Sequence, residues 1–511
     1  MKLRDLRKIK RAPLTWLIAL VLFIMFVIVV LKLTMVPLKY RLPVLGVFLM
    51  FLLINGVFTF KPVERKKSRR TGVTVLNCIL SLMLLVMDIG IPSFEKRIRD
   101  MFEDVPETET TTINVYAMTT DYKTEHIDLF RDTGHVITSL NLDDYRNEVF
   151  LTQTAVDQQN QQEAIEWLNK RLNVAQIALN PKETLWAAVG ALYQGESPVL
   201  IMNEGYEGML EEFDPFAKFS EDTVVIASIT LEIRNSLLDP DNIDVTKDPW
   251  GMFIGGNDER SKRLSTIGRT DVNMLIGVDP VHKQFLIISM PRDAYIPNPA
   301  LNDGLDKLTH LCNNGIANTV TGLKTYLDIP LTRYTMVNLE TFKKIVNALD
   351  GVDVNNPYSF HGGKYDFPAG ELHLDGEQAL AYVRERKSLP NGDFGRNEHQ
   401  TIVLRAILRR LLSVEIITRF NDLLESLKGT FVTNIRVNDI YRLVNMQMSD
   451  MAEWNMISYQ IKGTTGSAQT ASMPGLHLSV VYLNETQVNF VADQYRRLMA
   501  GEILEQQEMP Q

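Results

Sequence analysis

Residues 370–400 read GELHLDGEQALAYVRERKSLPNGDFGRNEHQ. If residues 383–386 are extended, Arg384 and Arg386 point to one face, because side chains alternate along a strand. A long helix is predicted to follow, running roughly from 396 to 413 with apolar residues at helical spacing. We therefore expect the guanidinium groups of Arg384 and Arg386 to lie on one surface, next to the start of the predicted helix.

The predicted helix adds polar groups to that surface. Arg396 and Gln400 are four residues apart and share a face, and Asp393 lies one turn before Arg396. Arginine forks match phosphate oxygens bidentately, and several arginines that face one another repel unless an anion lies between them. The pattern favours a phosphate-binding surface. The alternative is a solvated basic helix face whose charges pair with Glu385 and Glu398.

Charged residues also stand at the ends of apolar strands earlier in the chain. Asp258 follows MFIGGN, Asp271 precedes VNMLIGV, and Arg292 follows FLIISMP. Strand ends are where α/β sheets place ligand sites. Each residue taken alone is as well explained by a polar surface turn, and it is their convergence that favours a common site.

The 511 residues exceed one ordinary domain. Mixed strands and helices predict a large α/β domain of α-β-α type over residues 250–500, followed by a tail at 501–511. Strands such as INVYAM alternate with helices such as AIEWLNKRL and predict a smaller α/β domain over residues 113–240. This domain has no recognisable phosphate loop, metal cluster or nucleophile pattern, which favours an accessory role. Residues 93–112, acidic and rich in threonine towards their end, are predicted to be a linker.

Three uncharged apolar runs lie within residues 1–92, at 14–31, 42–60 and 71–87. Each is long enough to cross a hydrocarbon core of about 30 Å, the third only just. A single run of this kind would also suit a buried helix or a signal peptide. Three in succession with basic flanks, and no small-residue cleavage site before the first, favour membrane spans.

Charge divides the chain and predicts its orientation. Residues 1–87 carry fifteen Lys and Arg against two acids, whereas the remainder carries thirty-eight against sixty. The basic residues cluster in the N-terminal tail and the second loop, which places both in the cytoplasm and everything after residue 87 outside. No domain-wide basic surface points to nucleic acid. Cys78 and Cys312 are too differently placed to pair, so no disulfide is expected.

Over roughly residues 250–413 the chain resembles the LytR–CpsA–Psr phosphotransferases of Gram-positive envelopes. Three spans and an added α/β domain resemble the capsule-attachment branch of that family. The matching segments are GND at 256–258, RTD at 269–271, SMPRDAYI at 289–296, DKLTH at 306–310, VNLETFKKIVNALDGVDV at 337–354, PAGELHLDGEQALAYVRERK at 368–387 and GDFGR-x-x-x-Q at 392–400.

The resemblance implies an enzyme of the Gram-positive cell membrane that moves a glycan-phosphate, capsular or a related anionic polymer, from an undecaprenyl-diphosphate carrier to a peptidoglycan sugar. The implied partners are that carrier, peptidoglycan, the membrane and other capsule-synthesis proteins. Asp258 and Asp271 match the carboxylates associated with Mg²⁺ (or Mn²⁺). The diphosphate-binding set is matched by Arg292, Arg384, Arg386, Arg396 and Gln400, with Arg269 in support.

Asp258, Asp271, Arg292 and Asp393 are the residues expected to act in catalysis. Direct attack by the sugar hydroxyl, with Asp258 or Asp393 as base, is simpler than a covalent intermediate because no nucleophile pattern is present. The sequence departs from the family at His399, where arginine is common, and at Glu259. The alternative function is a non-catalytic polyprenyl-phosphate-binding regulator, which would need the arginines but not both metal-site aspartates.

Overall fold

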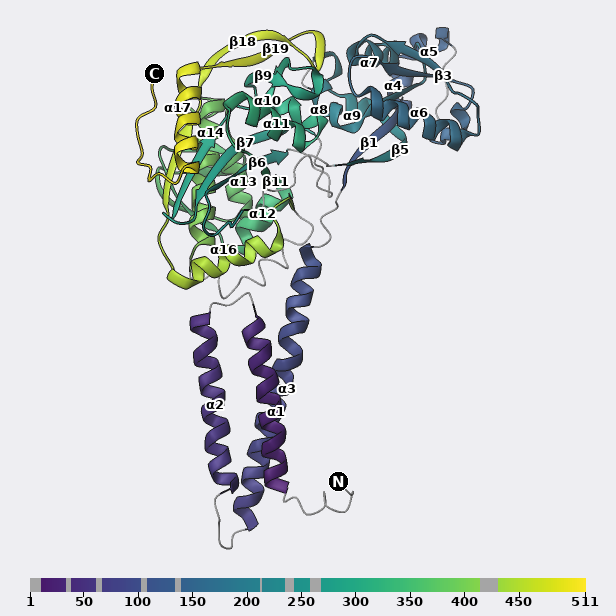
Figure 1. The fold of residues 1–511 in the computed structure, drawn as a ribbon. Coiled ribbons are helices and arrows are strands. Elements are labelled where there is room, and N and C mark those ends of the chain that lie inside the picture. Colours follow the sequence, from purple (N-terminus) through teal and green to yellow (C-terminus); the bar gives the residue numbers. More distant parts are fainter. Residues whose placement is uncertain are drawn as a thin grey trace. The chain divides into compact units, whose positions relative to one another are not determined.

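The computed structural model describes residues 11–33, 38–60, 67–102, 108–133, 139–211, 214–234, 243–257, 268–413 and 431–511. These form two compact units, one made mainly of the first 104 residues and one made of most of the rest. The predicted α/β class with three N-terminal apolar helices is confirmed (Figure 1).

The N-terminal part of the first unit is formed by α1 (Arg11–Lys32), α2 (Leu38–Phe60) and α3 (Lys67–Phe102). Each includes a segment long and apolar enough to cross a membrane, and large apolar side chains remain exposed along all three, as lipid-facing helices require. The third segment runs from residue 71 to 93, longer than the predicted 71–87. The prediction stopped at the charge of Asp88, but that side chain is buried and the helix continues through it. Helix α16 (Val437–Asp450) belongs to the same unit.

The second unit begins with a five-stranded sheet, hereafter the five-stranded region (residues 108–234). Strands β2, β3 and β4 run parallel, and β1 lies antiparallel between β4 and β5. The order is β3-β2-β4-β1-β5. The longer helices are α6 (Gln158–Leu172) and α7 (Leu185–Tyr193). The strands are β1 (Thr108–Met118), β2 (Val149–Gln153), β3 (Ala178–Lys182), β4 (Val199–Asn203) and β5 (Thr223–Arg234).

The linker prediction for residues 93–112 is wrong at both ends. Helix α3 continues to Phe102, and β1 starts at Thr108. The threonines that suggested a loop are β-branched, and they pair with β5 as an ordinary strand. Residues 103–107 lie outside the described residues.

Short helices complete the five-stranded region: α4 (Thr120–Glu125), α5 (Ile127–Thr133), η2 (Leu142–Tyr145), η3 (Glu204–Tyr206), α8 (Glu207–Leu210), η4 (Asp214–Phe216) and α9 (Phe219–Asp222).

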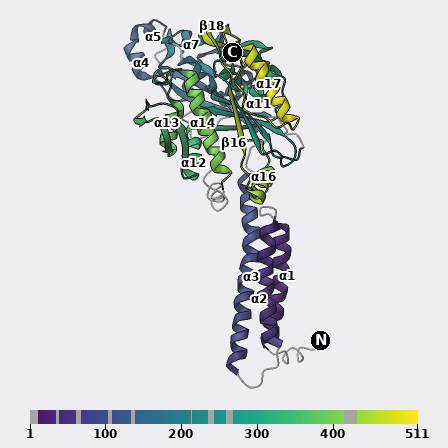
Figure 2. The same ribbon diagram turned by 90° about the vertical axis from the view of Figure 1, so that its left-hand side faces the viewer.

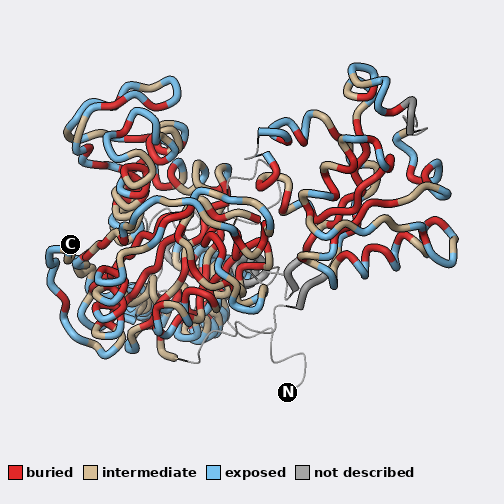
Figure 3. Tube along the Cα trace, turned by 90° about the horizontal axis from the view of Figure 1, so that it is seen from above, coloured by how far each residue is buried: buried red, intermediate tan, exposed pale blue. Residues whose placement is uncertain are grey.

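The remainder of this unit is built on a six-stranded sheet of order β16-β11-β6-β7-β8-β17, hereafter the six-stranded region. Parallel pairs β6–β11 and β8–β17 flank the antiparallel strand β7. Most residues of β6, β7 and β8 are buried, and Figure 3 shows buried stretches gathered inside the fold. The strands are β6 (Trp250–Asn257), β7 (Thr270–Asp279), β8 (Gln284–Ser289), β11 (Arg333–Asn338), β16 (Phe431–Thr433) and β17 (Asn455–Gln460).

Helices cover both faces of this sheet (Figure 2). Helices α11 (Ile316–Leu327) and α17 (Glu485–Met499) share one core with Ile457 and Tyr459 of β17. Ser458 points the opposite way and accepts a hydrogen bond from Arg405 of α14 (Asp393–Leu411), 3.1 Å away. The α-β-α arrangement follows from this alternation. Further elements are β9 (Tyr295–Asn298), η5 (Pro299–Leu301), β10 (Gly304–Lys307), α10 (Leu308–Leu311), η6 (Cys312–Asn314), α12 (Leu339–Ala348), β12 (Val352–Asn356), β13 (Phe360–Gly362), β14 (Tyr365–Phe367), β15 (Gly370–Leu374), α13 (Gly376–Arg384), β18 (Gly463–Thr470) and β19 (Met473–Leu483).

The expectation that residues 383–386 are extended is wrong in its first half. Helix α13 runs to Arg384, and the extended backbone begins at Glu385. The helix starts with a capping box, in which Asp375 and Gln378 satisfy each other's backbone N–H groups. That start signal precedes an amphipathic pattern and outweighs the short alternation. The following helix α14 begins at Asp393, three residues earlier than predicted.

Candidate functional site

The strand-end residues lie at one edge of the six-stranded sheet. Strand β7 is antiparallel to β6 and β8, so its first residues lie beside the last residues of both neighbours. Asp271 is the second residue of β7, and Arg292 follows the end of β8. Asp258 and Glu259 lie outside the described residues. The edge that α/β sheets use for ligands therefore holds two of the predicted groups.

Asp271 and Arg292 form the centre of the site. Arg292 Nη1 donates to Asp271 Oδ1 at 2.9 Å, and both side chains are largely buried. Burial alone would raise the pKa of the Asp271 carboxyl, but Arg292, Arg269 and Arg396 together hold that pKa below its ordinary value. Asp271 is thus ionised at neutral pH, with three arginines close enough to act on it.

Helix α14 brings Arg396 to this centre from another part of the chain. Arg396 is buried and pairs with Asp393 one turn earlier, with Nη2 and Oδ1 2.6 Å apart. Burial lowers the pKa of Arg396, Asp393 and Asp271 oppose that shift, and Arg292 and Arg386 add to it. Repulsion among these arginines favours an anion between them. Gln400, also buried, lies one turn further along α14.

Arg384 and Arg386 do not share a strand face as expected. Arg384 is the last residue of α13, whereas Arg386 follows the helix, and both are exposed. Arg386 is close enough to Arg396 to affect its pKa. The structure therefore associates Arg386 with the cluster and leaves Arg384 on an exposed helix end.

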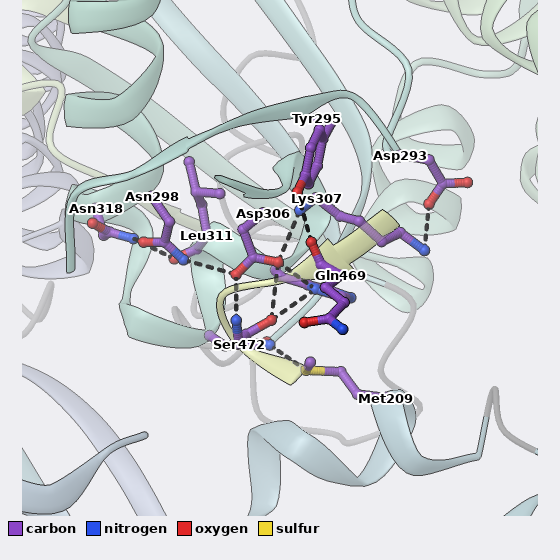
Figure 4. Close-up of polar contacts among 12 residues, drawn as sticks. Met209, Asp293, Tyr295, Asn298, Asp306, Lys307, Leu311, Asn318, Gln469 and Ser472 are labelled. Atoms are coloured by element: carbon purple, nitrogen blue, oxygen red, sulfur yellow. Dashed lines mark hydrogen bonds and ion pairs between the residues drawn. The ribbon is translucent and has the colours of Figure 1, made fainter. Parts of the chain in front are cut away.

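Two residues of the site were not predicted. Lys307 is almost fully buried, and its Nζ lies 2.6 Å from Asp293 Oδ1 (Figure 4). The other Asp293 oxygen is 3.9 Å from Arg292 Nε, so this carboxylate links the lysine to the central arginine. Both residues stand in quoted motifs, SMPRDAYI and DKLTH. Only the tertiary fold reveals that they are paired.

A buried polar network fixes the backbone beneath Lys307. Asp306 accepts hydrogen bonds from Asn298 Nδ2 at 3.1 Å and Ser472 Oγ at 2.9 Å (Figure 4). His310 Nδ1 lies 2.8 Å from Asp306 and 3.0 Å from Ser472. Both partners meet the same ring nitrogen, and all three side chains are buried. This geometry differs from a Ser–His–Asp triad, in which the serine meets the other nitrogen, and it fits a structural role.

His399 faces away from the arginine cluster. Its ring stacks on Tyr382 with centroids 4.3 Å apart and lies 4.7 Å from the ring of Phe360. Burial lowers the pKa of His399 to about 4, so the ring is neutral at pH 7. The departure from the family pattern at this position therefore alters an aromatic core and adds no charge to the site.

The carboxylates suit a hard divalent cation, although only part of the expected pair is described. An ionised Asp271 is a suitable oxygen ligand for Mg²⁺, which keeps several waters and needs few protein ligands. Within the described ranges, no group of three or more His, Cys, Asp or Glu side chains could hold a metal ion. The described donor set thus fits a metal bound through one or two carboxylates and a substrate, and it does not form a complete protein cage.

Comparisons with known proteins identify the family of this chain. TagU of Bacillus licheniformis, described as a polyisoprenyl-teichoic acid–peptidoglycan teichoic acid transferase, is 33% identical over 232 residues, covering 45% of this chain and 72% of the relative. TagU of Bacillus subtilis is 31% identical, covering 47% and 77%. The solved structure of Bacillus subtilis TagV is 26% identical, with a TM-score of 0.43, covering 50% and 98%. The sequence model of the LytR_cpsA_psr family matches residues 223–487, more than half of the chain, which therefore belongs to the LytR–CpsA–Psr family.

Proposed function

We propose that the protein transfers a glycan-phosphate from a polyprenyl-diphosphate carrier to a sugar hydroxyl of peptidoglycan. The observation that carries this proposal is the Asp271–Arg292–Arg396 cluster at the edge of the six-stranded sheet. Its relatives named TagU are teichoic acid transferases that act on peptidoglycan. The three N-terminal helices and the added five-stranded region resemble the capsule-attachment branch of the family, which favours an undecaprenyl carrier and a capsular or related anionic polymer.

The charges of the cluster suit the chemistry of diphosphate cleavage. A lipid diphosphate carries roughly two to three negative charges, and charge moves to the leaving oxygen as the bond breaks. Arg292, Arg396 and Lys307 are largely buried, so solvent screens them weakly. They lie where a diphosphate would meet fixed positive charge. Arg269 and Arg386 extend that charge, and Gln400 supplies an amide.

The transfer requires one bond to form and one to break. The acceptor hydroxyl oxygen bonds to the phosphorus that carries the glycan, and the bond from this phosphorus to the bridging oxygen breaks. Polyprenyl monophosphate leaves with the bond's electrons, and the hydroxyl proton passes to a base. Asp393 is a candidate base, because it lies beside Arg396 and remains about one-third exposed. Asp258 is the other.

Asp271 and Asp258 would hold Mg²⁺ or Mn²⁺, which supplies charge neutralisation at the diphosphate oxygens when bound. Asp271→Asn removes one charge at nearly constant shape. We expect Mg²⁺-dependent release of polyprenyl monophosphate to fall by a factor on the order of a hundred or more, as losses of electrostatic stabilisation do. Asp328→Asn is a matched control, because Asp328 is 98% exposed at the end of α11, before β11 begins at the opposite sheet edge.

Unchanged turnover in folded Asp271→Asn protein, or turnover unaffected by EDTA, would contradict metal-assisted transfer. Retained lipid binding with no turnover in any variant, wild type included, would instead favour the non-catalytic regulator.

The orientation of the chain is part of the proposal. The basic N-terminal tail and second loop are assigned to the cytoplasm, which places both sheet regions outside the cell membrane beside lipid-linked glycan and peptidoglycan. Protease added to intact protoplasts should digest the chain after residue 104. Full protection of that part would contradict the orientation.

A further inference from the structure

The five-stranded and six-stranded regions share a packed contact, hereafter the seam, formed by α8 on one side and by Arg269 and η6 on the other. One buried apolar cluster crosses it, since Tyr206 and Met209 pack with Met473 of β19. The residues of α8 precede the part of the chain that the family model matches. The five-stranded region thus touches the six-stranded region at a point where the family pattern has not begun.

At the seam, Gly208 lies directly against the Arg269 side chain. A Cβ atom added at Gly208 would lie 2.8 Å from Nη2, 3.0 Å from Nε and 3.1 Å from Cζ of Arg269. Side-chain carbons do not approach other atoms so closely, so any larger residue would displace the guanidinium. Gly208 is therefore what allows the guanidinium to pack on the α8 backbone.

Helix α8 is held firmly on its own side of the seam. Tyr116 Oη donates to Glu207 Oε1, and Asn114 Nδ2 donates to Tyr116 Oη at 3.0 Å. Met209 and Leu210 are buried in the shared apolar cluster. These contacts fix the four-residue helix, and with it the surface against which Arg269 packs.

The opposite side of the seam is tied to the same helix. The Gly268 N–H, next to Arg269, donates to the Cys312 carbonyl at 3.2 Å. Asn313, the following residue of η6, directs its amide to the Met209 sulfur. Figure 4 shows the Met209 side chain pointing towards the polar network that contains Ser472 and Asp306. The backbone of Arg269 and the surface under its side chain are thus held by one set of contacts.

Arg269 also acts on the candidate site. Arg269 stands two residues before Asp271, directly ahead of β7, so it enters the candidate site from the same segment of chain. Its charge also contributes to the low pKa of Asp271. An arginine side chain is long and flexible. A surface that fixes its direction reduces the conformational entropy that it loses when it binds an anion.

We propose that α8 is a positioning element for the candidate site, in which Gly208 keeps the Arg269 guanidinium directed towards Asp271 and the bound diphosphate. The five-stranded region thereby raises the affinity of the six-stranded region for a lipid diphosphate. This inference rests on the proposed function and assigns a role in it to a region whose sequence favours an accessory function.

The experiment measures binding of geranylgeranyl diphosphate, with Mg²⁺, to the full chain in detergent. Arg269→Ala should weaken binding about tenfold, as expected for a lost charge-assisted contact. Gly208→Ala should weaken it by a similar factor. The double variant should be no weaker than Arg269→Ala alone, because a residue that acts through Arg269 has nothing left to position.

A matched control is Gly190→Ala in α7 of the same region. A Cβ at Gly190 would meet only Phe216 Cζ, at an ordinary 4.0 Å, so binding should stay within about twofold of wild type. If Gly208→Ala does not fold, Tyr116→Phe releases Glu207 while keeping the aromatic ring. It should then weaken binding about threefold, and only where Arg269 is present.

The outcomes separate this inference from the proposed function. Wild-type affinity in Gly208→Ala, or additive losses in the double variant, would overturn the positioning role while Arg292→Ala still weakens binding. Absence of binding by the wild type would overturn the proposed function instead.

Discussion

The two sheets of the second unit carry opposite charges at corresponding edges. In the five-stranded sheet, β2 and β4 are parallel neighbours, and Asp157 and Glu204 follow their carboxyl ends. Burial raises the pKa of Asp157 to about 6, while Asn203 and Asn160 oppose the shift. In the six-stranded sheet, the equivalent edge holds Arg292 and the buried Arg396 beside Asp271.

This comparison shows that the fold alone does not locate an anion site. Both sheets offer the strand-end geometry that α/β proteins use for ligands. At the five-stranded edge a carboxylate is held by amides, and a diphosphate would meet negative charge. At the six-stranded edge three arginines act on Asp271, and an anion would relieve their mutual repulsion. Charge distribution selects between two similar frameworks.

The largest effect should come from Arg396→Ala. Arg396 is buried, and water cannot replace the charge and the paired hydrogen bonds of its guanidinium group. The affinity for geranylgeranyl diphosphate should therefore fall on the order of a hundredfold. Arg409→Ala, an exposed position on the same helix, should stay within about twofold. Asp157→Asn at the five-stranded edge should also stay within that range. A large loss from Asp157→Asn, or none from Arg396→Ala, would break the contrast between the edges.

The second prediction concerns the stability of the protein at low pH. It tests whether His399 is part of the edge that holds Arg292 and Arg396. The pKa of His399 is about 4 in the folded protein and lies near 6.5 in the unfolded chain. Between these two pH values His399 is protonated in the unfolded chain but neutral in the folded protein. The free energy of unfolding therefore falls as pH drops from about 6.5 towards 4. At about pH 5 the cost is about 2 kcal/mol.

The melting temperature of the wild type should fall between about pH 7.5 and pH 5, and His399→Phe should remove most of this fall. Phenylalanine fits an aromatic cluster and does not titrate. Diphosphate binding should remain within about twofold of wild type. A strong loss of binding in this variant would place His399 in the anion site, contrary to its contacts with Tyr382 and Phe360.

A smaller effect is expected at Arg386, which is exposed at the rim of the cluster. Arg386→Ala should weaken diphosphate binding about tenfold, and Arg386→Lys should lie between that variant and wild type, since lysine keeps the charge but loses the fork. Equal affinities in a lipid-binding assay for all three proteins would remove Arg386 from the site.

Much of the candidate site could be predicted because it lies at the ends of strongly apolar strands. The segments around Asp271 and Arg292 are buried runs, and a polar residue that ends such a run must lie near a sheet edge. Helix α14 was predictable from its apolar spacing, and its position fixed the relation between Arg396 and Gln400. Local pattern and simple geometry sufficed for these residues.

What could not be predicted depends on contacts distant in sequence or on competing local signals. The capping box at Asp375 turned an expected strand into the end of α13, which separated Arg384 from Arg386. The Lys307–Asp293 pair and the packing of Gly208 on Arg269 join segments whose pairing no periodicity records. Asp258 lies outside the described residues, so its predicted role as a metal ligand stays a prediction.

The most direct test of the central claim is a crystal structure of the protein with geranylgeranyl diphosphate and Mn²⁺, with the metal located by anomalous scattering. The account predicts a manganese peak in contact with the Asp271 carboxylate and diphosphate oxygens within hydrogen-bonding distance of Arg292 and Arg396. A diphosphate bound elsewhere, at the five-stranded edge for example, or a metal remote from Asp271, would contradict it.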